Sequence, residues 1–106
     1  MNAPVSYAAN ANIGVITIDN PPVNALSHAV RAGIMTALES AKAGNVDAIV
    51  IACAGRTFCA GADITEFGKP PQEPSLPDVV NAIESSSVPV VAALHGTALG
   101  GGFEIA

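Results

Sequence analysis

The chain has 106 residues, of which 50% are hydrophobic and 12% are charged, and its formal net charge is −5. This composition is too apolar for a disordered protein, and the length allows one small domain at most. Four basic residues cannot form a basic patch for nucleic acid or an anionic membrane. No signal peptide and no run of membrane-spanning length is visible. We therefore expect a soluble protein of a reducing compartment, with its two cysteines as thiols.

The first half of the chain predicts a strand, a helix and a second strand. Residues 13–19 are rich in β-branched side chains and predict a strand, which Asn20-Pro21-Pro22 ends. A helix follows, with Ser27 as its N-cap and Gly44-Asn45 as its end. Its expected apolar face is Leu26, Val30, Gly33, Ile34, Ala37, Leu38 and Ala41. Its expected polar face is His28, Arg31, Thr36 and Glu39. Residues 48–53 are wholly apolar and predict a strand covered on both sides.

The second half predicts a proline-rich loop, a short helix and a third strand. Residues 68–77 contain four prolines and predict an irregular surface loop. Asp78 is expected to cap a helix over residues 79–85, and residues 88–94 predict a strand with Pro89 near its start. Further helices are expected to open near Ala62 and Phe103. The alternation of strands and helices predicts an α/β fold with crossover connections.

Two glycine-rich motifs, Cys59–Ile64 and Gly96–Glu104, each follow a predicted strand and lead into a predicted helix. Small residues at such a junction leave backbone N–H groups accessible, and two converging loops could stabilise an oxyanion. Glu104 would place a carboxylate beside those donors. The residues alone leave two simpler interpretations open, a tight glycine turn and an acid favoured by the helix dipole. The spacing matches neither a P-loop nor a dinucleotide fingerprint.

Other polar residues predict structure rather than chemistry. Asn24 is expected to fix its turn through backbone hydrogen bonds, and His28 to be solvated. His95, which precedes the second motif, has no paired Ser, Cys or Asp motif and is interpreted as structural. Cys53 is expected in the core, whereas a nucleophilic role for Cys59 is not favoured. No cluster has metal-ligand spacing.

Three segments together resemble the enoyl-CoA hydratase/isomerase (crotonase) family: Asn20–Ser27, Phe58–Phe67, and Val88–Ala93 followed by Gly96–Glu104. The pattern is most similar to the N-terminal part of multifunctional fatty-acid β-oxidation enzymes. The resemblance implies the crotonase (ClpP/crotonase-like) fold, a spiral of ββα units. Residues 1–106 would then be the N-terminal part of one hydratase/isomerase domain, taken from a longer protein.

The resemblance also implies roles for particular residues. The reaction would be addition of water to a trans-2-enoyl-CoA, with the Ala62 and Gly101 N–H groups as the oxyanion hole and Glu104 as the catalytic acid or base. A second glutamate of the family's hydratases would lie beyond residue 106, which leaves hydratase and isomerase both open. The positions implied in substrate and CoA binding are Ala60, Ala62, Asp63, Ile64 and Thr65.

Several alternatives and partners follow from the same resemblance. Double-bond isomerisation, thioester hydrolysis and decarboxylation share the oxyanion hole, and a non-catalytic CoA-binding or assembly fragment is also possible. Hydration would need no cofactor or metal, and NAD only if a dehydrogenase part follows. Arg56 and Lys69 are the basic candidates for the CoA phosphates. The expected partners are an acyl-CoA and either a second copy or the missing C-terminal part, in the cytoplasm or, in a eukaryote, the peroxisome.

Overall fold

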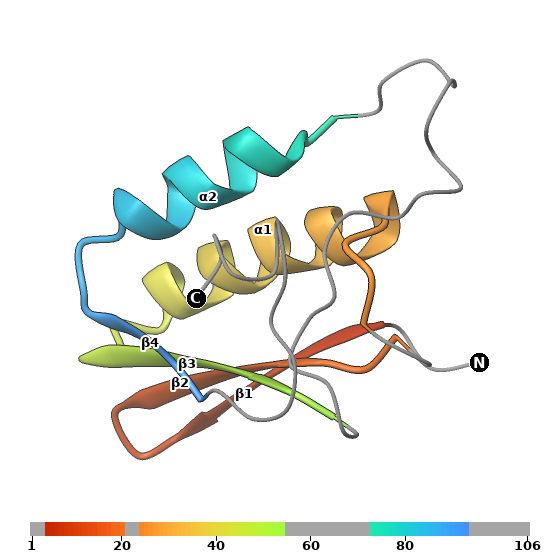
Figure 1. Cartoon of the computed structure of the whole chain (residues 1–106). Coiled ribbons are helices and arrows are strands. Elements are labelled where there is room, and N and C mark those ends of the chain that lie inside the picture. Colours follow the sequence, from red (N-terminus) through yellow and green to blue (C-terminus); the bar gives the residue numbers. More distant parts are fainter. Residues whose placement is uncertain (1–3, 21–23, 55–72, 94–106) are drawn as a thin grey trace, which may run out of the picture.

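The computed structural model describes residues 4–20, 24–54 and 73–93, which form a four-stranded sheet with two helices on one of its faces (Figure 1). The elements are β1 Val5–Asn10, β2 Ile13–Ile18, α1 His28–Ala43, β3 Ala48–Cys53, α2 Leu76–Glu84 and β4 Val90–Ala92. The mixed α/β architecture that the alternation predicts is confirmed.

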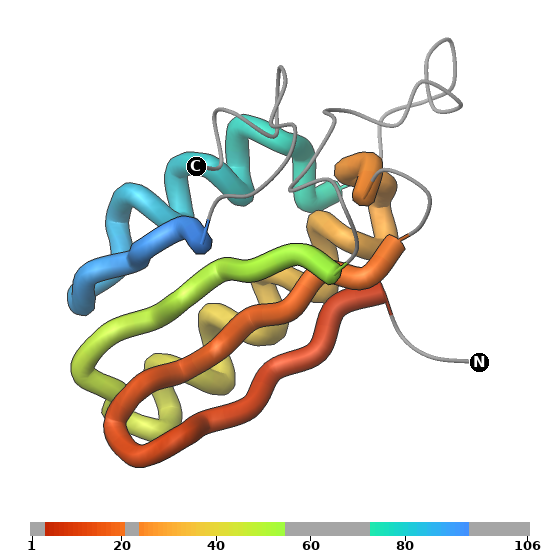
Figure 2. The backbone as a smooth tube through the Cα atoms, turned by 60° about the horizontal axis from the view of Figure 1, so that its bottom comes forward, coloured from red at the N-terminus to blue at the C-terminus, as the bar shows by residue number. Residues whose placement is uncertain are grey.

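The strands stand in the sheet in the order in which they occur in the chain, β1-β2-β3-β4 (Figure 2). Strand β1 forms an antiparallel hairpin with β2, whereas β2, β3 and β4 run parallel. The parallel pairs require crossovers, which α1 and α2 provide. Strand β1 was not among the predicted elements, because most of its residues are exposed and it lacks an apolar run. It nevertheless pairs with β2 along its whole length, from Val5 opposite Ile18 to Asn10 opposite Ile13.

The core lies between the sheet and α1. Alternate residues of β2 and β3 point towards the helices because side chains in a strand alternate between faces. The fully or almost fully buried members are Ile16, Ile18, Ile49 and Ile51 from the sheet, and Val30, Ile34, Ala37 and Ala41 from α1. Cys53 belongs to the same cluster, as predicted.

The opposite face of the sheet carries an apolar row in register. Val15 of β2 lies opposite Val50 of β3, which lies opposite Val91 of β4. Val91 is 56% exposed. Both described helices lie on the other face (Figure 1), so the prediction that β3 is covered on both sides is not met by the described part of the chain.

Helix α1 begins and ends where the sequence predicts. The Ser27 side chain accepts a hydrogen bond from the Val30 N–H, and Gly44 is the C-cap. Thr36 and Glu39 are exposed, as expected. Arg31 is buried, with only 8% of the residue accessible, so its assignment to the polar face of the helix was wrong.

Helix α2 begins two residues before Asp78. Its N-cap is Ser75, whose hydroxyl accepts from the Asp78 N–H while the Asp78 carboxylate accepts from the Ser75 N–H. Asp78 is therefore the third helical residue of a capping box and not the cap. Pro77 lies in the first turn, where its missing N–H costs no helical hydrogen bond, so the irregular stretch predicted over 68–77 extends too far.

Strand β4 is shorter than the predicted 88–94, although the Pro89 carbonyl still accepts from the Ile49 N–H.

Gly33 allows α1 to approach β1 closely. A Cβ atom at this position would lie 2.7 Å from Cβ of Val5. Gly33→Ala is therefore expected to lower the free energy of unfolding by about 1 kcal/mol, because an overpacking cost of about 1–3 kcal/mol exceeds the gain in helix propensity. Urea denaturation measures this change. The matched control is Gly44→Ala, whose Cβ would meet its nearest atom at an ordinary 3.4 Å. A Gly33→Ala protein as stable as the control would contradict the close approach.

Candidate functional site at the carboxyl edge of the sheet

The two glycine-rich motifs follow neighbouring parallel strands. Strands β3 and β4 pair directly and run in the same direction, so the chain leaves both at one edge of the sheet. The pairing continues one residue beyond each strand, since the Ala54 N–H donates to Ile18 O at 2.8 Å and the Ala93 N–H to Ile51 O at 2.9 Å. Ligands of α/β proteins bind at this carboxyl edge. The described strands therefore carry the chain towards both motifs from one side.

The predicted site residues themselves lie outside the described residues. These are Ala60, Ala62, Asp63, Ile64, Thr65, Gly101 and Glu104, together with Arg56, Cys59, Lys69 and His95. Their roles stay predictions. The described residues include the ends of β3 and β4, which precede the two motifs, and the side chains that bind the chain at this end of the sheet.

Asn24 holds the carboxyl edge of the sheet. The residue is 3% exposed, and its φ of 55° lies in the left-handed region that Asn tolerates. Its Oδ1 accepts from the Asn20 N–H at 2.8 Å, which confirms the prediction that Asn24 fixes its own turn. Its Nδ2 donates to Ala54 O at 2.9 Å, a contact that the sequence did not reveal. The turn before α1 is thereby joined to the chain just beyond β3.

Arg31 and His28 hold the segment that leads into α2. Arg31 Nε donates to Pro74 O at 2.8 Å, and its Nη1 donates to Leu26 O at 2.7 Å. His28 Nε2 lies 2.9 Å from Glu73 O, and because a carbonyl only accepts, Nε2 carries the hydrogen. His28 is half-buried and its contact with Glu73 is exposed, so the prediction that it is solvated holds only in part. Helical periodicity could not show this, because the contacts come from a segment more than forty positions away in sequence.

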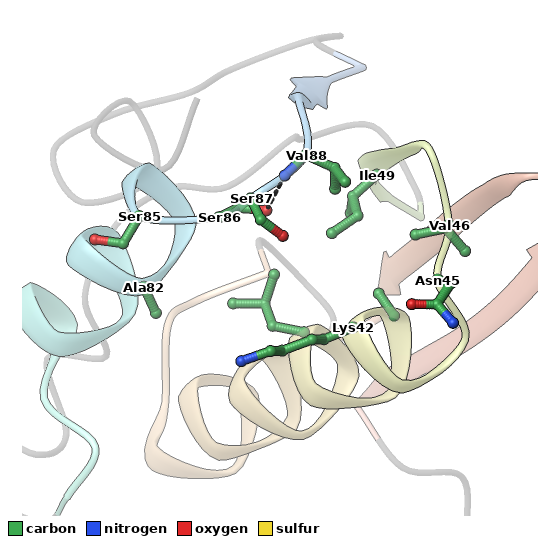
Figure 3. Close-up of a pocket in the computed structure, with 11 residues that line it drawn as sticks. Lys42, Asn45, Val46, Ile49, Ala82, Ser85, Ser86, Ser87 and Val88 are labelled. Atoms are coloured by element: carbon green, nitrogen blue, oxygen red, sulfur yellow. Dashed lines mark hydrogen bonds between the residues drawn. The ribbon is translucent and has the colours of Figure 1, made fainter.

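A hollow of about 550 Å³ lies at the other end of the sheet, where β3 and β4 begin (Figure 3). Its lining is Leu38, Ala41, Lys42, Asn45, Val46, Ile49, Ala82, Ser85, Ser86, Ser87 and Val88. Lys42 is the one charged residue of that lining, so the hollow holds no acid–base pair. No motif singled out in the sequence indicates this hollow. This hollow is separate from the edge that leads to the glycine-rich motifs.

Two further classes of site receive no support from residues 4–20, 24–54 and 73–93. No group of three His, Cys, Asp or Glu side chains in these ranges could hold a metal ion. Neither described helix is long and apolar enough to cross a membrane.

The architecture is that of solved enoyl-CoA hydratase/isomerase structures. A probable enoyl-CoA hydratase/isomerase from Mycobacterium abscessus superimposes with a TM-score of 0.85 at 30% sequence identity, over 99% of this chain and 42% of that one. The crotonase-type fold expected from the sequence is thereby confirmed for this portion.

The family model for enoyl-CoA hydratase/isomerase matches residues 8–106, and the chain belongs to this family. It is 50% identical over 96 residues to the peroxisomal bifunctional enzyme of Danio rerio, covering 90% of this chain and 13% of that protein. It is 41% identical over 114 residues to a probable enoyl-CoA hydratase of Bacillus subtilis, covering the whole chain and 44% of that protein. The chain thus spans less than half the length of these relatives.

Proposed function

We propose that the complete protein hydrates trans-2-enoyl-CoA thioesters in fatty-acid β-oxidation. The observation that carries the proposal is the direct parallel pairing of β3 and β4, each followed by a glycine-rich motif, in a chain of this family. The Bacillus subtilis relative is named a probable enoyl-CoA hydratase, and a relative from Oryza sativa is named a peroxisomal fatty acid beta-oxidation multifunctional protein, which supports the same activity.

In the proposed reaction the enzyme stabilises a thioester enolate. The N–H groups of Ala62 and Gly101 hold the thioester oxygen as negative charge develops on it. Water attacks the β carbon and gives its proton to Glu104, while the π electrons move onto the thioester oxygen. Glu104 then returns this proton to the α carbon of the enolate, which restores the carboxylate and gives the saturated 3-hydroxyacyl thioester. The backbone of residues 60–65 holds the CoA portion.

This chemistry needs no cofactor, because water and substrate supply every atom and electron. NAD enters only if the complete protein also carries a dehydrogenase part, and the Danio rerio relative is named a bifunctional enzyme, which is compatible with a second activity. The proposed partner is the acyl-CoA substrate. The proposed location is the cytoplasm, or the peroxisome in a eukaryote, since curated relatives are named peroxisomal.

The test is a hydration assay on the complete protein. Crotonyl-CoA should lose the absorbance of its conjugated thioester, and 3-hydroxybutyryl-CoA should form. A 3-enoyl-CoA substrate tests the alternative, double-bond isomerisation, which uses the same oxyanion donors. Turnover of the 3-enoyl substrate alone would replace hydration by isomerisation, whereas CoA-thioester binding without either reaction would favour a non-catalytic binding role.

The isolated chain of residues 1–106 is expected to be inactive and to self-associate. It supplies one proposed catalytic carboxylate, Glu104, and its sheet leaves the row of Val15, Val50 and Val91 without a described covering element. Apolar faces of this kind drive association. Light scattering combined with the crotonyl-CoA assay tests both expectations. A monodisperse monomer with measurable turnover would contradict them.

A further inference from the structure

One short stretch of chain binds the backbone on both sides of residues 55–72. Asn24 donates to Ala54 O, immediately before this segment, and Arg31 donates to Pro74 O, shortly after it. The end of β3, the start of α1 and the start of α2 lie at the same end of the molecule in both views (Figures 1 and 2). Residues 55–72 contain the first glycine-rich motif, Cys59–Ile64.

The chemistry of Asn24 and Arg31 is explained by these hydrogen bonds to distant backbone and not by stabilisation of α1. A cation in the first turn of a helix opposes the helix dipole, so the position of Arg31 is not explained by stabilisation of α1. Its guanidinium instead satisfies two carbonyls from separate segments, Leu26 and Pro74, which a lysine ammonium cannot match in geometry. Asn24 combines tolerance of a positive φ with one donor and one acceptor.

We propose that Asn24 and Arg31 are positioning residues for the first glycine-rich motif, because they hold the backbone just before and just after residues 55–72, the stretch of sequence that contains it. The inference rests on the proposed function, in which this motif supplies the Ala62 N–H and the CoA-binding backbone. Glu104 belongs to the second motif, which follows β4. Loss of either anchor should therefore weaken substrate binding and oxyanion stabilisation together, since displacements of about 1 Å can lower rates by about 10²-fold.

Two variants test the pair in the complete protein. Asn24→Asp keeps the acceptor for Asn20 and the tolerance of positive φ but has no donor for Ala54 O. Arg31→Met keeps the aliphatic stem and removes both donors. In each we expect KM for crotonyl-CoA to rise by about tenfold or more and kcat to fall. Arg31→Lys should recover part of the loss, because one ammonium donor can reach one carbonyl.

Two control variants separate positioning from charge and stability. Lys42→Met removes an exposed cation from the far end of α1, and Ile34→Val lowers stability from the buried face of the same helix. Both should leave KM and kcat per folded molecule within about twofold of wild type. Unchanged KM and kcat in Asn24→Asp and Arg31→Met would overturn the proposal.

Amide exchange of the ligand-free protein distinguishes failure of this inference from failure of the proposed function. Faster exchange of the Ala54 amide in Asn24→Asp, and of the Ser75 amide in Arg31→Met, supports the anchors without any substrate. Unchanged exchange at both amides overturns them. Absence of hydration and of CoA-thioester binding in the wild type rejects the proposed function, whatever the exchange rates are.

Discussion

Replacing Glu104 by glutamine in the complete protein is expected to lower kcat for crotonyl-CoA hydration by about 10²-fold or more. Glutamine has nearly the same shape as glutamate but cannot take a proton from water. The fold and the dissociation constant for a CoA thioester should therefore change little. Stopped-flow loss of the conjugated thioester absorbance gives kcat, and titration with a non-reacting acyl-CoA gives the dissociation constant.

Glu84→Gln is the matched control for this substitution. Glu84 is exposed at the end of α2, so its replacement removes one carboxylate without touching the carboxyl edge of the sheet. It should leave kcat unchanged within the usual scatter of surface variants. A Glu104→Gln enzyme within a few-fold of wild type would remove Glu104 from the mechanism.

Deleting one oxyanion donor is expected to cost on the order of 3 kcal/mol of transition-state stabilisation, which is about 10²-fold in kcat. The proposed donors are the backbone N–H groups of Ala62 and Gly101, so substituting the side chains of these residues does not remove them. An ester in place of the amide, introduced by semisynthesis at either position, removes the N–H and keeps the chain geometry. Proline would also remove it but would restrict φ as well.

The change in kcat is compared with the change in substrate affinity to show whether the deleted N–H acts in the transition state. A donor aimed at developing charge contributes more in the transition state than in the ground state, so kcat should fall more than binding weakens. A loss below about 1 kcal/mol would be that of an ordinary hydrogen bond and would mean that the N–H points elsewhere.

The sequence predicted the elements whose signals are local. Helix α1 was found from its apolar spacing, the Ser27 cap and Gly44, and its ends agree with the structure. Strands β2 and β3 were found because β-branched and apolar residues concentrate in them. The turn-fixing role of Asn24 was also local, since its partner Asn20 is four residues away.

What the sequence missed depends on contacts between distant segments. Strand β1 is defined by its pairing with β2 and not by its own composition. The start of α2 was misplaced because prolines usually end regular structure, whereas Pro77 occupies a turn that tolerates it. Arg31 was assigned to the polar face because spacing alone cannot show that the chain returns to it at Pro74. The roles of Ala62, Gly101 and Glu104 came from motif resemblance and await the experiments above.

The sequential strand order has a consequence for synthesis on the ribosome. Because β1, β2, β3 and β4 neighbour one another in the order in which they are made, each new strand can add to the edge formed just before it. None of these four strands has to insert between two that are already paired. The hairpin of β1 and β2 closes only a short loop, and each parallel strand follows with its crossover helix. The sheet can therefore form from the N-terminus, one strand at a time, while later segments are still being translated.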